Sequence, residues 1–191
     1  MGFTRAELES FRNTTVPDLV GPGLKLLFVG INPGLWTAAT STHFAHPGNR
    51  FYPALYEAGV IDVPIDRGRG MDDHERAALV ARGIGITNLV ARATAKASEL
   101  TADELREGGL RLVALVEAHQ PRVVAVAGVT AYRDAFGCRD AVAGRQPEPF
   151  AGAELWVVPN PSGLNAHATQ ASLAAAYRAP ALAAGIALAP R

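Results

Sequence analysis

The chain has very little cysteine and lysine. Cys138 is the single cysteine among 191 residues, so a disulfide within the chain is excluded and a reducing compartment is favoured. We interpret Cys138 as a small buried or half-buried thiol and not as a nucleophile. Lys25 and Lys96 are the only lysines, and every other basic side chain is an arginine.

Long apolar runs and an excess of charge are also lacking. No window contains the roughly 18 consecutive apolar residues of a membrane helix. Residues 1–15 mix charged and apolar side chains and do not resemble a signal peptide. Lys and Arg total 18, as do Asp and Glu, so a polyanion would need a local basic patch. We expect a soluble, cytoplasmic monomer with no membrane partner.

Hydrophobic residues make up 49% of the chain, which is enough to form a substantial core. Together with the length of 191 residues, this suits one domain over residues 1–191. Apolar, β-branched runs predict strands at 24–29, 84–90, 123–127 and 155–158. Helical spacing and capping signals predict helices at 49–58, 72–82, 101–119 (interrupted near Gly108 and Gly109), 128–136 and from 169 onward, where Pro180 is expected to kink or divide the helix. Residues 137–152 look irregular. The pattern predicts an α/β fold, a three-layer α/β/α sandwich with a mostly parallel central sheet.

Three predicted strands end in polar, glycine- or proline-rich loops, at 30–34, 87–88 and 160–164. Ligands of open parallel sheets bind in the crevice at the carboxyl ends of the strands. We therefore expect these three loops to border one crevice, with Asn32 on its floor.

Several motifs occur together and in a specific order: GINPG at 30–34, HFAHPGNRFY at 43–52, GITNLVARAT at 85–94, the segment 105–128, and VPNPSGL at 158–164. On these motifs the chain, from Leu24 to about Tyr177, resembles the mismatch-specific uracil-DNA glycosylase and thymine-DNA glycosylase family of the uracil-DNA glycosylase superfamily. The resemblance implies a uracil-DNA glycosylase-like fold. It also implies a monofunctional enzyme that releases uracil, and perhaps related damaged pyrimidines, from mismatched double-stranded DNA to start base excision repair. Neither a cofactor nor a metal is implied.

Asn32 matches the family's catalytic asparagine, which holds the attacking water. Hydrolysis of a glycosidic bond develops positive charge on the sugar and negative charge on the base, and a neutral amide suits such a site. An amide is no general base at neutral pH, so Asn32 would position the water without deprotonating it. Considered without the other motifs, Asn32 is better explained as a turn asparagine before Pro33 that caps its own backbone, and only the additional motifs favour the catalytic role.

The same resemblance assigns a base pocket. Phe44 matches the aromatic residue that stacks on the flipped base, and Thr37 matches the position facing the C5 edge of the pyrimidine, which predicts a preference for uracil over thymine. Asn88 and His43 match pocket residues of the eukaryotic branch, with a strand-end cap and a solvated loop histidine as the alternatives. The remaining pocket residues are in the first motif: Gly30 and Ile31.

The last loop is expected to contact DNA. Leu164 matches the wedge that fills the space left by the flipped nucleotide. Ser162 and Gly163 offer a hydroxyl and backbone amides to phosphate, and the other DNA contacts predicted are Asn160, Asn165 and Arg50, the last with a surface salt bridge as its alternative. Ala166 stands where many members of the family have an arginine that holds the opposite strand.

Other chemistries have weaker support. His43 and His46 lie in a proline-containing loop without a completing carboxylate or cysteine, so no metal site is expected. Lys25 opens a strand and Lys96 is expected in a remote loop, which argues against a Schiff-base lysine. A non-catalytic lesion-binding module and a nucleosidase acting on free nucleosides are the alternative functions.

Overall fold

The computed structural model describes residues 2–166 and 168–190, and its centre is a five-stranded sheet. The strands lie in the order β2 (Ile84–Asn88), β1 (Leu26–Gly30), β3 (Val123–Ala127), β5 (Glu154–Val158) and β4 (Gly144–Arg145). The first four are parallel, and only β4 pairs antiparallel. The prediction of a mostly parallel central sheet is confirmed.

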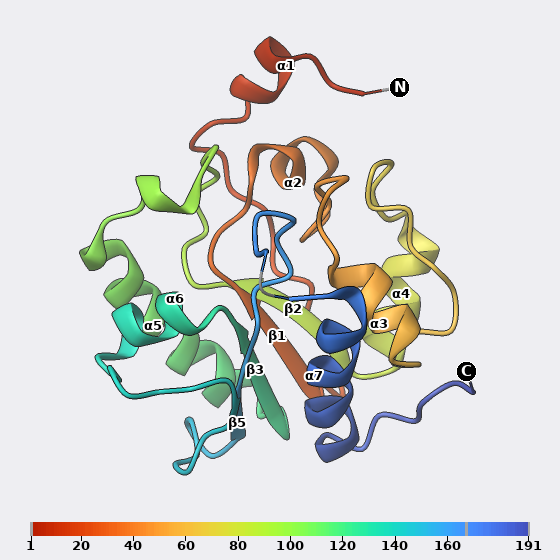
Figure 1. Cartoon of the computed structure of the whole chain (residues 1–191), viewed down its shortest axis with the longest axis vertical. Coiled ribbons are helices and arrows are strands. Elements are labelled where there is room, and N and C mark those ends of the chain that lie inside the picture. The colour runs from red at the N-terminus through yellow and green to blue at the C-terminus, as the bar shows by residue number, and fades with distance from the viewer. Residues whose placement is uncertain (1, 167, 191) are drawn as a thin grey trace.

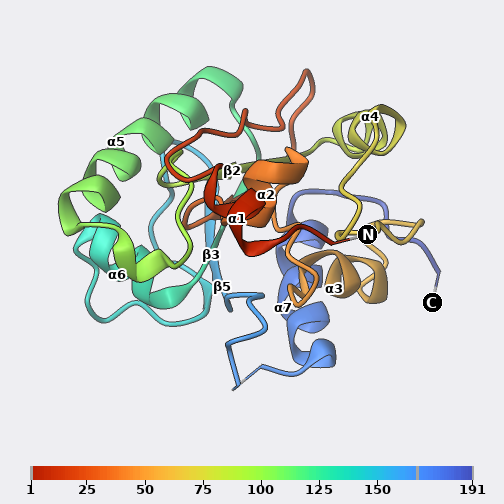
Figure 2. The same cartoon turned by 90° about the horizontal axis from the view of Figure 1, so that it is seen from above.

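Helices cover both faces of this sheet (Figure 1). One face carries α5 (Ala102–His119) and α6 (Val129–Phe136). The other carries α3 (Phe51–Glu57), α4 (Asp73–Ala81) and α7 (Gln170–Ala183), and the view from above shows the two groups on opposite sides (Figure 2). The short helices α1 (Arg5–Glu9), α2 (Leu35–Thr40) and η1 (Ala97–Glu99) complete the described elements. The three-layer sandwich is therefore confirmed.

The two central strands β1 and β3 are buried on both faces because they are apolar at every position. Along β1, Leu26 and Phe28 belong to the core under α3 and α7, whereas Leu27 and Val29 belong to the core under α5 and α6. All four side chains are fully buried. This alternation explains why a continuous apolar run, and not an alternating one, marks each parallel strand.

The predicted interruption of α5 is wrong. The helix runs unbroken from a capping box at Thr101 and Glu104 through Gly108 and Gly109. A Cβ at position 108 would lie 2.3 Å from the carbonyl oxygen of Leu89. Gly108 therefore allows α5 to approach the backbone that follows β2, and the tertiary contact compensates for the low helix propensity of glycine.

Three smaller expectations also change, and one further helix is found. The loop after β1 contains α2, and residues 137–152, expected to be irregular, contain β4. Helix α7 continues past Pro180 without being divided. Cys138 is exposed and not buried, because it follows the left-handed Gly137 that ends α6 at the surface.

Candidate active site

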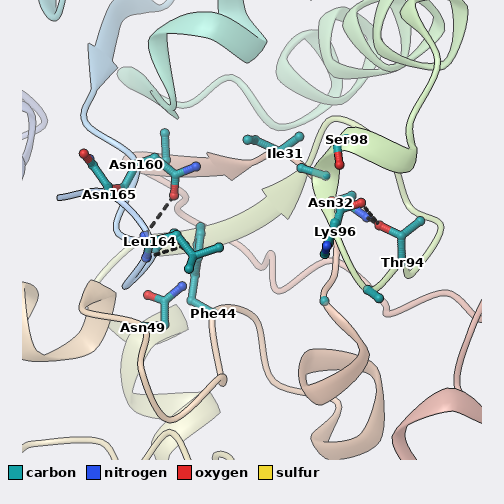
Figure 3. A pocket seen from close by; sticks show the side chains of 15 residues that line it. Ile31, Asn32, Phe44, Asn49, Thr94, Lys96, Ser98, Asn160, Leu164 and Asn165 are labelled. Atoms are coloured by element: carbon teal, nitrogen blue, oxygen red, sulfur yellow. Dashed lines mark hydrogen bonds between the residues drawn. The ribbon is translucent and has the colours of Figure 1, made fainter. Parts of the chain in front are cut away.

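A cavity of about 540 Å³ lies where the parallel strands end, within the size range of small-molecule sites (Figure 3). Two of the three predicted loops border it, those after β1 and β5. The expectation for the third loop, 87–88, is wrong, because these residues do not line the cavity. Residues 94–98, further along the chain after β2, line it instead, and so do residues of the loop before α3. The described lining residues are Ile31, Asn32, Gly34, Phe44, Asn49, Thr94, Ala95, Lys96, Ala97, Ser98, Ala127, Asn160, Ser162, Leu164 and Asn165.

Backbone pairing that extends beyond the sheet brings the first two segments together. Past the last β1–β2 pair, the amides of Leu89 and Val90 donate to the carbonyls of Gly30 and Ile31, each at 2.9 Å. The amide of Thr94 then donates to Pro33 at 3.1 Å, next to a parallel bridge between Gly34 and Thr94. The GINPG loop is thus fixed along its length to the chain that follows β2.

The Asn32 amide is held in one orientation. Its nitrogen donates to the carbonyl oxygens of Pro33 (3.1 Å) and Arg92 (3.0 Å) and to Thr94 Oγ1 (2.7 Å). Both carbonyls are acceptors only, and the Thr94 hydroxyl uses its proton on the carbonyl of Lys96 at 2.8 Å, so all three partners require a donor. Within the described residues, no protein donor bonds Oδ1 of Asn32, which leaves this oxygen to accept a hydrogen bond from water in the cavity.

Phe44 presents an aromatic face to the same cavity. Its ring stacks on Phe51, with centroids 4.1 Å apart and planes inclined by 26°. The backbone of Phe44 has a φ of +57°, an uncommon conformation for an aromatic residue that the surrounding packing must enforce. Since Phe51 covers one face of the ring, the side that lines the cavity is available for stacking with a planar ligand.

His43 and Asn88 lie behind Phe44 and are not among the described residues that line the cavity. His43 is 2% exposed, so it is not a solvated loop histidine. Its Nε2 faces the carbonyl of Pro17 at 3.0 Å and must carry the proton, so Nδ1 accepts from Asn88 Nδ2 at 2.9 Å. Burial lowers the pKa of His43, which keeps the ring neutral. The pair supports the pocket from behind.

Gly30 provides the space for this support. A Cβ at position 30 would lie 2.3 Å from Asn88 Oδ1 and 3.1 Å from Phe44 Cζ. The amide oxygen and the aromatic ring therefore both pack on the bare Cα of Gly30. Glycine is required here for close approach, and not for an unusual backbone angle.

Thr37 does not have the position expected of it. It is 5% exposed within α2 and is not one of the described lining residues. The residue-level reason for preferring uracil over thymine is therefore not supported by the side-chain arrangement.

The loop between β5 and α7 presents Leu164 to solvent. Leu164 is 94% exposed, whereas the loop beneath it is tightly bonded. Asn160 Oδ1 accepts from the Ser162 amide at 2.9 Å, and Ser162 Oγ accepts from the Leu164 amide at 3.3 Å. A Cβ at Gly163 would lie 2.7 Å from the carbonyl of Gly48, so glycine lets the loop pass over the chain before α3. Asn165 Nδ2 donates to the carbonyl of Asn160 at 2.9 Å, closing the loop.

Arg50 holds this loop in place. This role differs from the DNA phosphate contact predicted for Arg50 and from its alternative, a surface salt bridge. Its guanidinium donates to the carbonyl oxygens of Ser162 (2.9 Å), Asn165 (2.8 Å) and Ala168. Neither a salt bridge nor a free phosphate contact describes this arrangement, because two of the guanidinium nitrogens are directed at backbone oxygens. Arg50 instead fixes the base of the segment that carries Leu164.

Sequence reasoning missed four polar lining residues: Asn49, Thr94, Lys96 and Ser98. Thr94 closes the GITNLVARAT motif, so its place in that motif was the available signal. Lys96 was expected in a remote loop, and this is wrong, since its side chain lies beside Asn32 (Figure 3). The bridge between Gly34 and Thr94 places residues 94–98 at the cavity, and no local sequence pattern predicts this bridge.

Residues 2–166 and 168–190 show neither a metal-binding cluster nor a membrane-spanning helix. There, no group of three or more His, Cys, Asp or Glu side chains is arranged to hold a metal ion. None of the described helices has the length and apolar character needed to cross a membrane.

Comparison with known proteins agrees with the geometry. A model of the uracil DNA glycosylase superfamily matches residues 17–183. Among solved structures, the chain is similar to the solution NMR structure of a protein from Methanosarcina acetivorans that is provisionally assigned as a uracil DNA glycosylase. The TM-score is 0.60 at 19% sequence identity, and the match covers 86% of this chain and 96% of the other. At that identity the structural likeness supports the fold.

Proposed function

Because the chain belongs to the uracil DNA glycosylase superfamily, we propose that it is a monofunctional glycosylase that hydrolyses uracil from mismatched double-stranded DNA. The observation that carries the proposal is the orientation of Asn32. Three acceptors hold its nitrogen, its oxygen has no protein donor among the described residues, and Asn32 lines a cavity together with Phe44 and Leu164. Each of these three side chains has a separate part in extracting and hydrolysing a base.

Base extraction comes first, because a glycosidic bond inside the duplex is out of reach. Flipping a nucleotide costs a few kcal/mol and is easiest where pairing is already poor, which favours mismatches. Leu164 is exposed on a braced loop and would occupy the space left in the helix. Phe44 would then stack on the extruded pyrimidine, an interaction of about 1–3 kcal/mol.

Hydrolysis follows at the Asn32 end of the cavity. The amide oxygen accepts a hydrogen bond from water and orients its lone pair toward C1′ of the sugar. As the bond between C1′ and N1 breaks, its electron pair leaves with the base. Water forms the new bond to C1′ and remains there as a hydroxyl, and its second proton passes to solvent or to the released base. Since an amide does not accept that proton at neutral pH, catalysis rests on positioning and electrostatics, and slow chemistry is expected.

A single duplex experiment tests the proposal. The protein is incubated in excess with an end-labelled duplex carrying one G·U pair, and samples are analysed with and without hot alkali. We expect strand cleavage only after alkali, and a single-turnover rate at least on the order of 100-fold lower for Asn32→Ala. Binding of that variant to an abasic duplex should persist. A-U duplex and single-stranded substrates measure the mismatch preference.

Other outcomes have equally clear meanings. Cleavage without alkali would exclude a monofunctional enzyme. A mobility shift with no alkali-sensitive site would indicate a lesion-binding module, and release of bases from free nucleosides alone would indicate a nucleosidase. An Asn32→Ala variant that keeps most of the wild-type rate would remove Asn32 from the mechanism.

A further inference from the structure

Lys96 is the one charged side chain among the described residues that line the cavity. It is exposed, and no ion pair joins it to a carboxylate within the described chain. The nearest acid along the chain, Glu99, uses its carboxylate on Arg12 and on the backbone amide of Lys96 (2.9 Å). The ammonium is therefore left with its positive charge uncompensated at the rim of an otherwise neutral site.

The arginines close to the site are committed elsewhere. Arg50 donates to three backbone carbonyls of the Leu164 loop. Arg92 pairs with Glu104 at 2.8 Å and also donates to Asn13. Hydrogen bonding to Arg92 lowers the pKa of Glu104 to about 2, so this pair stays charged at neutral pH. Lys96 is consequently the cation best placed to meet a polyanion that enters the cavity.

The position of Lys96 agrees with the order of groups in a nucleotide. Figure 3 shows Phe44 and Leu164 on one wall and Asn32, Lys96 and Ser98 on the opposite wall. A base stacked on Phe44 brings its sugar toward Asn32, where the water must lie. The next group along the DNA strand is a phosphate, and the next side chains are Lys96 and Ser98.

We propose that Lys96 binds one of the two phosphates that flank the flipped nucleotide, with the Ser98 hydroxyl as a neighbouring donor. The inference rests on the proposed function and adds a specific contact to it. Lysine suits this task because its ammonium acts as a mobile point charge and tolerates a phosphate that moves during flipping. Lys96 is thereby a DNA-binding residue on the wall of the cavity opposite Leu164. The two side chains together would hold the target strand on both sides of the extruded nucleotide.

The test uses salt dependence and single-phosphate substitution. Dissociation constants for a duplex with an abasic-site analogue are measured between 0.05 and 0.3 M salt, conditions chosen so that phosphate contacts dominate the slope. For Lys96→Gln we expect the slope of log K against log salt to fall by about 0.9, and binding at 0.1 M salt to weaken on the order of five- to ten-fold. Lys96→Arg should restore the slope.

Lys25 offers a matched control within the chain. It precedes β1, at the end of the strand opposite Gly30 and about 17 Å away along five strand residues. Lys25→Gln removes the same charge, so its slope should equal that of the wild type. Neutral methylphosphonate linkages placed one at a time around the lesion then locate the contact. A methylphosphonate at one position should weaken binding by the wild type several-fold and should not weaken binding by Lys96→Gln any further.

Four results would overturn the assignment, three of them from the binding measurements. The first is a slope of log K against log salt that is unchanged in Lys96→Gln, and the second is an equal slope in Lys96→Gln and Lys25→Gln. The third is a set of methylphosphonate linkages that weaken binding of the wild type and of Lys96→Gln by the same factor at every position. Borohydride trapping of a covalent adduct with abasic DNA that depends on Lys96 would also overturn it, since the amine would then form a Schiff base with C1′. The wild-type G·U assay separates this failure from that of the proposed function. If uracil is released and the slopes do not differ, only Lys96 is misassigned; if the wild type neither binds nor cleaves, both fail.

Discussion

The substitution Gly30→Ala gives the sharpest test of how the pocket is supported. A methyl group at position 30 would lie 2.3 Å from Asn88 Oδ1 and 3.1 Å and 3.3 Å from two carbons of Phe44. A contact of 2.3 Å does not occur, so Asn88 must move, and the ring of Phe44 must shift by a few tenths of an ångström. The strand itself has little freedom to adjust, because β1 is paired with β2 and β3 on either side.

The magnitude follows from two terms. Overpacking a buried site costs about 1–3 kcal/mol. Displacing Asn88 also breaks its 2.9 Å bond to His43 Nδ1, and an unsatisfied buried acceptor costs about 1–3 kcal/mol. We expect Gly30→Ala to lower the free energy of unfolding by about 2–6 kcal/mol. For a chain of this size, that corresponds to a fall in Tm on the order of 10 °C.

Gly34→Ala is the matched control for stability, because it changes the second glycine of the same motif. A Cβ at position 34 has no heavy atom within 4 Å, and its φ of −75° suits alanine. Its effect on the free energy of unfolding should stay within about 1 kcal/mol. Urea unfolding followed by circular dichroism measures both variants. Equal midpoints for the two alanines would refute the idea that Gly30 holds the space for Asn88 and Phe44.

The remaining predictions concern Leu164, the Asn32 amide, the Arg50 contacts and the pH dependence of stability. Leu164→Ala should leave Tm unchanged, because the side chain is 94% exposed, and should reduce single-turnover uracil release at least ten-fold. Thr94→Val removes one of three acceptors of the Asn32 amide, so the chemical rate should fall about ten-fold while duplex binding persists, and Thr94→Ser should restore it. Arg50→Lys should weaken the Leu164 loop, seen as faster amide hydrogen exchange over 162–168, because one ammonium cannot serve three carbonyls in the guanidinium geometry. Burial lowers the pKa of His43, so the unfolded chain binds its proton first and stability should fall as pH drops below about 6.5. His43→Gln should flatten the pH dependence of the urea midpoint in that window, and an unchanged slope would contradict the role of His43.

The sequence determined the architecture of this protein. Short, β-branched apolar runs such as 123–127 favour strands buried on both faces, and their alternation with helical patterns predicts an α/β/α sandwich. Capping boxes at Thr101 and Asp72 set the starts of α5 and α4 for equally local reasons. The GINPG and VPNPSGL motifs, each directly after a strand, placed Asn32 and Leu164 at one edge of the sheet because the carboxyl ends of parallel strands share an edge.

Tertiary structure alone decided which side chains face the cavity and what each one contacts. Arg50 bonds to carbonyls more than 110 residues away, and the Asn32 amide is oriented by Thr94, which arrives through pairing between two loops. His43 and Asn88 lie behind Phe44, and Lys96 came to the cavity from a segment expected to be remote. Residue types and local spacing report what a segment prefers by itself. The direction of a side chain at a loop depends on partners brought from elsewhere in the chain, and those partners exist only once the sheet has assembled.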